Sequence, residues 1–201
     1  MDFRDTVKQS TLPNGLTVVS DTIPGGIMKG QLVCYTGSRH DTREQLGLAH
    51  LAEHMISHAN PNYSADDFGL INNARNLLEY NLMTSENETN YYASGRPQAV
   101  LDYLSDMIDG MIHLDYTPEL FELERGRIIN EMKSYLSNPD RRKFQSKMVS
   151  LFNESAMSIW TGGIPETLEN LSCEDAKKHH HEMHVGNNMG LFVSGPMEHH
   201  E

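Results

Sequence analysis

The chain has 201 residues, of which 38% are hydrophobic and 22% are charged, and its formal net charge is −12. A chain of this length can bury enough core to fold without disulfides, and its two cysteines, Cys34 and Cys173, lack the paired spacing of a thiolate zinc site or a disulfide framework. The negative charge disfavours nucleic acid and anionic membranes as partners, because their phosphates would repel an acidic protein.

The first residues of the chain, MDFRDTVKQS, are charged and contain no apolar run. We therefore expect no secretory signal, no membrane span and a cytoplasmic protein. Residues 10–23, STLPNGLTVVSDTI, place a Pro-Asn-Gly turn between two strand-like runs, which predicts a β-hairpin. Residues 28–38, MKGQLVCYTGS, are typical of another strand, and residues 45–58 carry apolar side chains at helical spacing.

The middle of the chain alternates between helical and extended patterns. Ser64 and Asp67 form a capping box for a second helix. Residues 81–95, NLMTSENETNYYASG, are rich in β-type residues and indicate extended structure. A helix follows over residues 97–112. The side chains that we expect to face inward from it are Val100, Leu101, Leu104, Ile108 and Met111.

Capping signals mark three helices in the rest of the chain. Thr117 and Asn138 each precede a proline and predict the starts of two successive helices. Ser172 and Asp175 cap a last helix that ends near Gly186, and residues 188–195 close as a strand. Interspersed helices and strands predict one α+β domain over residues 1–201, with a largely antiparallel sheet packed with helices. The helix after Asn138 carries one apolar stripe, formed by Phe144, Met148, Leu151 and Phe152.

Residues 47–58, GLAHLAEHMISH, contain the first candidate site. Positions i, i+3 and i+4 of a helix share a face, so His50, Glu53 and His54 project together. Two imidazoles one turn apart can both reach a zinc ion at roughly 2.0–2.1 Å, and the glutamate can face the water on that ion. The order H-x-x-E-H is the inverzincin signature. The alternative is a chance match on the solvated side of an amphipathic helix.

A catalytic zinc has three protein ligands and one water, so a third ligand must come from elsewhere. Glu124 and Glu131 lie seven residues apart, about two helical turns, and therefore point to one side of the helix after Thr117. For either glutamate taken on its own, a solvated surface position would be the favoured interpretation. The apolar residues expected on the opposite, core-facing side are Leu120, Leu123, Ile128 and Ile129.

These motifs resemble those of the inverzincin metallopeptidase family that includes pitrilysin, insulysin and the mitochondrial processing peptidase. LPNGLTVV and YTGSRHDTREQLGLAHLAEHM are similar to the family's opening hairpin and its approach to the zinc helix. NLMTSENETNYY resembles its N-A-x-T segment, and ELERGRIINEMKSYLSNPDRRKF its distal glutamate helix. GGIPETLENLSCEDAKKHHHEMHVGNNMGLFVSG resembles the closing helix and strand of its N-terminal domain. The resemblance covers the chain in order, from about residue 11 to residue 195, and implies a pitrilysin-type domain.

The resemblance implies a role for each candidate residue. His50, His54 and Glu131 would be the zinc ligands, and Glu53 would be the general base. Glu124 would orient a ligand imidazole and raise its basicity. The metal would be zinc, which two imidazoles and one carboxylate suit, although manganese or cobalt could substitute.

The resemblance also implies a function and a substrate site. Asn81 would belong to an edge strand that pairs with the substrate backbone, and Leu82, which replaces the family's alanine, would narrow the pocket beside it. The implied protein is a zinc-dependent endopeptidase in which Glu53 activates a zinc-bound water to hydrolyse peptides or unstructured protein segments. The alternative is a non-catalytic peptide-binding or assembly module that keeps the metal site.

Other histidines receive no ligand role. We expect His58 to be a partly exposed polar residue, and the four histidines of residues 179–184 to be helix-end residues, where cations favour the helix dipole. Family members carry at least two such domains, and an arginine–tyrosine pair from the later half assists catalysis. Nothing in these 201 residues matches that pair, so we expect a homodimer or a complex with a second related chain.

Overall fold

A six-stranded sheet organises the part of the chain that this computed structural model describes, namely residues 6–58, 63–64, 67–114, 117–153, 155, 158 and 160–199. All neighbouring strands in it are antiparallel except β2 and β6, which are parallel. The α+β class and the largely antiparallel sheet are therefore confirmed. In spatial order the strands are β1 (Val7–Thr11), β2 (Thr17–Thr22), β6 (Met189–Gly195), β3 (Met28–Cys34), β5 (Thr89–Gly95) and β4 (Glu79–Thr84).

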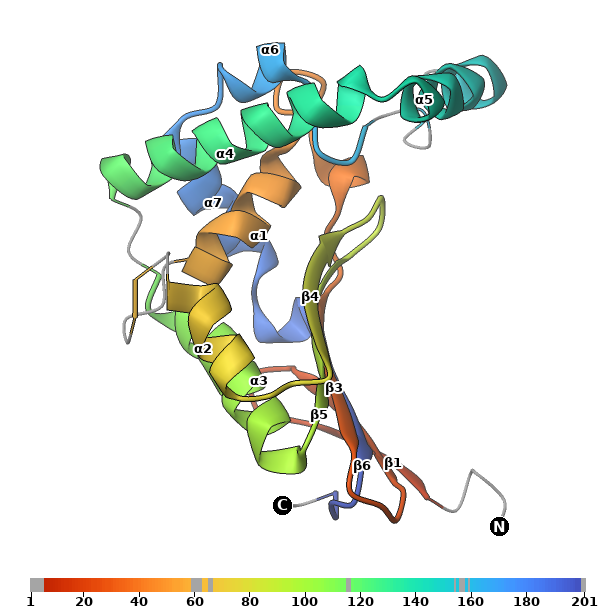
Figure 1. Cartoon of the computed structure of the whole chain (residues 1–201), viewed down its shortest axis with the longest axis vertical. Helices are drawn as coiled ribbons and strands as arrows, with labels where there is room; N and C mark the ends of the chain where they lie inside the picture. Colours follow the sequence, from red (N-terminus) through yellow and green to blue (C-terminus); the bar gives the residue numbers. More distant parts are fainter. Residues whose placement is uncertain are drawn as a thin grey trace.

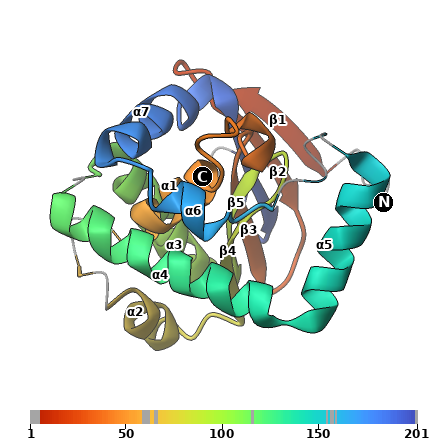
Figure 2. The ribbon, with the colours of Figure 1, turned by 90° about the horizontal axis from the view of Figure 1, so that it is seen from above.

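Helices cover one side of this sheet and extend beyond it (Figure 1). They are α1 (Leu48–His58), α2 (Phe68–Ala74), α3 (Pro97–Ile112), α4 (Pro118–Ser137), α5 (Pro139–Phe152), α6 (Pro165–Leu168) and α7 (Cys173–Met183). The central helix is α1, which packs against α3, α4, α7 and strand β4. Helix α5 leaves the end of α4 and lies at the periphery of the molecule (Figure 2). No described helix combines the length and the apolar character that a membrane crossing requires.

The predicted start signals of three helices form the expected hydrogen bonds. The Thr117 hydroxyl accepts from the Leu120 amide at 3.1 Å, and the Asn138 side chain accepts from the Asp140 amide at 2.9 Å. Ser172 forms the predicted capping box of α7. The boundaries of two helices were predicted less well. Helix α7 ends at Met183, before the expected Gly186. Likewise α2 begins only at Phe68, after the contact between Ser64 and Asp67.

Two hydrophobic clusters hold α1 from different sides. One lies between the sheet and α3 and includes Ile56 of α1. The other lies between α1, α4, α6 and α7 and includes Leu51 and Met55 of α1. Because apolar neighbours occupy both sides, the polar stripe of α1 is held in a fixed orientation toward β4 and α4. The largest stabilising term is burial, worth about 1.5–3 kcal/mol for each large apolar side chain.

One expectation about a buried face was only partly right. On α4, Ile128 is buried as expected and Leu120 and Ile129 pack against the second cluster, but Leu123 is 48% exposed. Glu124 is buried together with Phe121 and Met132, so the core-facing side of α4 also carries a glutamate that we expected on the opposite side. On α5 none of the described residues is buried. Its apolar stripe is largely open, and the exposed members of that stripe are Phe144, Leu151 and Phe152.

Candidate metal centre

The start of α1 is fixed by a buried carboxylate. Asp41 accepts hydrogen bonds from the amides of Gly47, at 2.9 Å, and Ala49, at 3.1 Å. Burial raises the pKa of Asp41 to about 7, against the opposing effect of these amides. Gly47 has a φ of +96°, and a Cβ there would lie 2.8 Å from the carbonyl oxygen of Gly162. A positive φ and a close backbone approach therefore require glycine at the turn that leads into α1.

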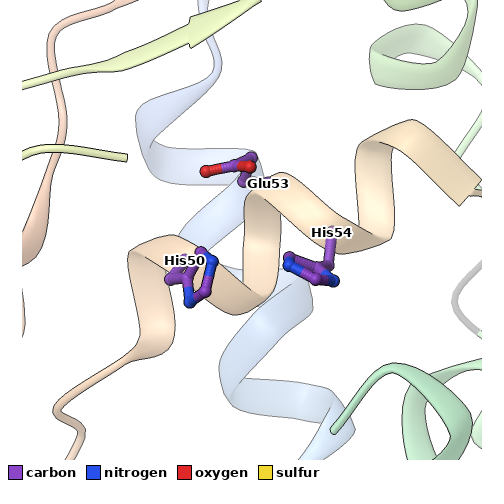
Figure 3. A group of neighbouring side chains, drawn as sticks. All are labelled: His50, Glu53 and His54. Carbon is purple, nitrogen blue, oxygen red and sulfur yellow. The ribbon is translucent and has the colours of Figure 1, made fainter. Parts of the chain in front are cut away.

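Helix α1 presents His50, Glu53 and His54 together (Figure 3). Their ligand-type atoms all lie within 4.8 Å of one another. The carboxylate of Glu131, on α4, comes to the same place: its Oε2 lies 3.6 Å from His54 Nε2 and 3.9 Å from His50 Nε2. Two ligands of a tetrahedral zinc ion are about 3.3 Å apart, given bonds of about 2.0–2.2 Å. The Glu131 oxygen thus lies about 0.3 Å and 0.6 Å beyond this spacing from the two Nε2 atoms, and two imidazoles with one carboxylate are a donor set that fits zinc.

The two histidines differ in their electrostatic surroundings. Burial, aided by the charge of His54, lowers the pKa of His50 to about 3, so His50 is neutral at physiological pH. Burial would also lower the pKa of His54, but the hydrogen bond with Glu124 and the charges of Glu53, Glu124 and Glu131 raise it above its ordinary value. Neutral imidazole is the form that binds metal, so the raised pKa of His54 means that protons compete with a cation for this residue.

Glu124 is a fully buried carboxylate behind His54. Its Oε2 accepts from His54 Nδ1 at 3.3 Å, and its Oε1 accepts from Arg127 Nη1 at 2.6 Å. His58, for which the sequence indicated no role, places Nδ1 2.9 Å from the same Oε2. Burial would raise the pKa of Glu124, but these three neighbours lower it to about 2. Because a carboxylate only accepts, the His54 proton is fixed on Nδ1 and Nε2 is left facing Glu131.

Glu53 is buried and held by strand β4. The hydroxyl of Thr84, the last residue of β4, donates to the Glu53 carboxylate. Burial raises the pKa of Glu53 to about 7, opposed by His54 and Thr84. Sequence reasoning missed Thr84, although it is the threonine of the N-L-M-T segment, and its position in that motif was the available signal.

A cavity of about 660 Å³ opens beside these residues. Strand β4 contributes Asn81, Met83 and Thr84 to its lining, and α5 contributes Arg141, Phe144, Gln145 and Met148. Leu82 does not narrow this space as expected. Leu82 is absent from the cavity lining, and its side chain packs instead against the core cluster of the sheet. On the remaining side the cavity is lined by His50, Glu131, Met132, Tyr135, Trp160, Thr161 and Gly162, with Glu86 next to β4.

Two histidines at the end of α7, His179 and His180, are not the cationic helix-end residues that the sequence suggested. His179 and His180 are each 6% exposed. Burial is the largest cause that lowers the pKa of both side chains to about 4, so they are neutral at physiological pH. Within the described part of the chain, groups of three possible metal ligands within 4.8 Å occur only around α1.

Known proteins that resemble this chain include one family profile and several relatives. The profile of one protein family, described as Insulinase (Peptidase family M16), matches residues 17–159. The beta subunit of the mitochondrial-processing peptidase of Caenorhabditis elegans is 25% identical over 191 residues, which cover 94% of this chain and 41% of that protein. An uncharacterised zinc protease of Streptomyces coelicolor is 25% identical over 206 residues, covering 96% of this chain and 42% of that protein. The chain thus spans less than half the length of these relatives.

A solved structure shares the fold. The crystal structure of a protease from Helicobacter pylori superposes with a TM-score of 0.87 at 23% sequence identity. The match covers 96% of this chain and 46% of that one. At this level of identity the similarity speaks for the arrangement of helices and strands alone.

Proposed function

The chain belongs to the insulinase family of peptidases, family M16, and from that premise we propose that it provides the zinc site of an endopeptidase that hydrolyses peptides or unstructured protein segments. The names of relatives as zinc protease and processing peptidase support a metallopeptidase. Since the chain covers less than half of their length, the activity of the whole protein is part of the proposal.

One observation carries the proposal: the Nε2 atoms of His50 and His54 approach the same oxygen of Glu131, at 3.9 and 3.6 Å. These three residues would hold zinc, which when bound supplies a Lewis acid for the scissile carbonyl and lowers the pKa of its water. Glu124 keeps the Nδ1 proton of His54 in place, so that Nε2 of His54 is free for the metal.

Glu53 would act as the general base. It is buried next to the two imidazoles, and Thr84 orients its carboxylate from β4. The carboxylate would accept a proton from the attacking water and pass it to the leaving amine, so that Glu53 acts first as a base and then as an acid while the peptide bond is broken. Burial raises the pKa of Glu53 to about 7, which favours reversible proton transfer near neutral pH.

The substrate would lie along β4, which is the last strand of the sheet order on that side. An extended peptide could add to this edge by backbone hydrogen bonds, with Asn81 among the residues beside it. The cavity of about 660 Å³ between β4 and α5 would receive side chains of the peptide. A second chain, either another copy or a related protein, would close the open side; one relative is itself named as a subunit.

The alternative is a non-catalytic module that binds peptides and keeps the metal site. A buried, oriented Glu53 favours the enzyme, because peptide binding alone does not need a base there. Turnover of a quenched peptide library, with and without a chelator and then with zinc restored, tests the choice. Chelator-sensitive hydrolysis supports the peptidase, whereas zinc-loaded protein that binds peptides without cleaving them supports the module.

A further inference from the structure

His58 ends α1 and belongs to neither the proposed ligand set nor the cavity. It lies one turn after His54, with its side chain 18% exposed and its ring edge-on to Phe68 at a centroid distance of 6.0 Å. Its Nδ1 is 2.9 Å from Glu124 Oε2, the oxygen that also accepts from His54. The contact is an ion pair when the ring is protonated, and it lacks the alignment of a linear hydrogen bond.

Two roles could explain this grouping. The ligand-type atoms of His54, His58 and Glu124 lie within 4.8 Å of one another, as a second metal site would require. The guanidinium of Arg127, however, contacts the other oxygen of the same carboxylate at 2.6 Å. A second cation would sit beside this positive charge and would displace the Nδ1 proton of His54 that Glu124 already accepts. The surroundings therefore favour a role for His58 through Glu124 rather than a second ion.

One contact of the Glu124 carboxylate lies within α4, and two join α4 to α1. Arg127 is on α4, three residues after Glu124, so this ion pair ties the carboxylate to its own helix. His54 and His58 are both on α1, so their contacts tie α4 to the helix that carries the proposed zinc ligands. Without His58, the carboxylate would be free to turn toward Arg127, and its contact with His54, already 3.3 Å long, would weaken.

We propose that His58 is a positioning residue of the metal centre: it holds the Glu124 carboxylate against His54, and so keeps Nε2 of His54 directed at the metal. The inference rests on the proposed function, since it assigns a role around the same zinc site. Its consequence is that the zinc affinity of the chain depends on a side chain that touches neither the metal nor the substrate.

The substitution His58→Leu tests this role, with His58→Lys as the rescue and His113→Leu as the control. Lysine can return an N–H donor to Glu124, whereas His113 is an exposed residue after α3. We expect His58→Leu to weaken zinc binding about tenfold, the lower end of the usual effect of residues behind a ligand. We expect His58→Lys to restore most of the affinity and His113→Leu to leave it unchanged. The turnover number should fall with the affinity in His58→Leu, and KM should stay close to its original value.

Zinc affinity is measured by competition with a chromophoric chelator at one pH, beside the thermal unfolding of each zinc-free protein. Should His58→Leu fail to fold, His58→Gln replaces it. Affinity within twofold of the unsubstituted protein would overturn the inference. A loss of zinc affinity in His58→Leu that is not restored in His58→Lys would also overturn it. A stoichiometry of two zinc ions per unsubstituted chain that falls to one in His58→Leu would overturn it as well. If the unsubstituted protein bound no zinc, the proposed function would itself fall, which separates that failure from failure of this inference alone.

Discussion

His50 and His54 lie one turn apart on α1, yet their neighbours shift the pKa of each in opposite directions. Burial lowers the pKa of His50 to about 3. Burial acts on His54 as well, but Glu124 and two further carboxylates outweigh it and raise the pKa. The same side chain is therefore a ready ligand at one position and holds a proton more tightly at the other. Zinc binding should release a proton mainly from His54, so affinity falls as the solution becomes more acidic.

Glu53→Gln is the sharpest test of the base. Glutamine keeps the size of the side chain, and its amide oxygen can still accept from the Thr84 hydroxyl, but it cannot take a proton. We expect zinc content to be unchanged and peptide turnover to fall on the order of 10²–10⁴-fold, as is typical when a general base is removed. Metal analysis and quenched-peptide hydrolysis measure the two quantities. Turnover close to that of the unsubstituted protein would rule out a base role for Glu53.

The two glutamates of α4 should separate by their effect on zinc. Glu131→Gln removes a proposed ligand, so we expect zinc to be lost at micromolar protein. Glu124→Gln removes a group behind His54 and should weaken affinity about 10–100-fold without abolishing binding. Glu119→Gln, at an exposed position in the first turn of α4, serves as the control. Equal zinc loss in the first two variants would mean that the ligand role is exchanged or shared between Glu124 and Glu131.

At the scale of elements, the zinc-bearing helix depends on Asp41. Asp41→Ala leaves the buried amides of Gly47 and Ala49 without their acceptor. An unsatisfied buried donor costs about 1–3 kcal/mol, so we expect a loss of unfolding free energy of at least that size. Asp41→Asn should be tolerated better, because burial raises the pKa of Asp41 to about 7 and already disfavours its charge. Denaturant unfolding measures both, and a loss no larger than that of the exposed Asp140→Ala would contradict the assignment.

The end of α7 should make the protein sensitive to acid. The pKa of His179 is about 4 in the folded protein, below its ordinary value of about 6.5. The unfolded chain therefore binds more protons between these values, and the stability gained by burying a neutral His179 is present above pH 6.5 and is lost as the pH falls toward 4. Between pH 7 and pH 5 this loss is about 2 kcal/mol.

His179→Gln isolates that contribution. Asp41 and Glu53 have pKa values raised to about 7 and change stability in the opposite direction over the same range, so the pH profile of one protein alone is ambiguous. The difference between the unsubstituted protein and His179→Gln removes their effect. We expect this difference in unfolding free energy, measured by urea unfolding, to change by about 2 kcal/mol between pH 7 and pH 5. The corresponding difference for His181→Gln, at an exposed position, should stay the same. Parallel profiles for the unsubstituted protein and His179→Gln would contradict the prediction.

The elements that the sequence predicted best have local causes. The caps at Thr117, Asn138 and Ser172 depend on residues within three positions, and all three formed. The errors concern burial, which depends on distant parts of the chain. On α4, Leu123 was expected to face the core but is 48% exposed. His179 looked like a cationic end residue because nothing near it in sequence reveals that it would be buried.

The candidate site was predictable to the extent that its residues follow helical spacing. His50, Glu53 and His54 share a face for that reason. Glu131 and Thr84 reach the same place only through the packing of α4 and β4 on α1, which no local pattern contains. The resemblance to the peptidase family identified Glu131 as a candidate ligand, whereas Thr84 was found only in the structure.

At the scale of the whole molecule, two surfaces lack a partner within the described residues. Strand β4 ends the sheet beside the cavity, and an open edge strand is prone to pair with another chain. Helix α5 exposes apolar side chains, and Figure 2 places it at the periphery, across the sheet from α7. Both surfaces adjoin the same cavity, since each contributes residues to its lining. A partner that covers α5 would therefore also approach the proposed zinc site.

We accordingly predict that the active form is a homodimer or a complex with a related chain that contacts α5. Leu151→Glu changes a residue that is 64% exposed, so it should weaken association and activity at micromolar concentration while leaving unfolding almost unchanged. Leu70→Glu, at a leucine of α2 that is 68% exposed, is the matched control. Sedimentation and specific activity are measured over a dilution series of each protein. The series is run with the protein alone and again with any related chain from the same organism. A monomer of constant specific activity, insensitive to Leu151→Glu, would mean that the open zinc site suffices and that α5 contacts no partner.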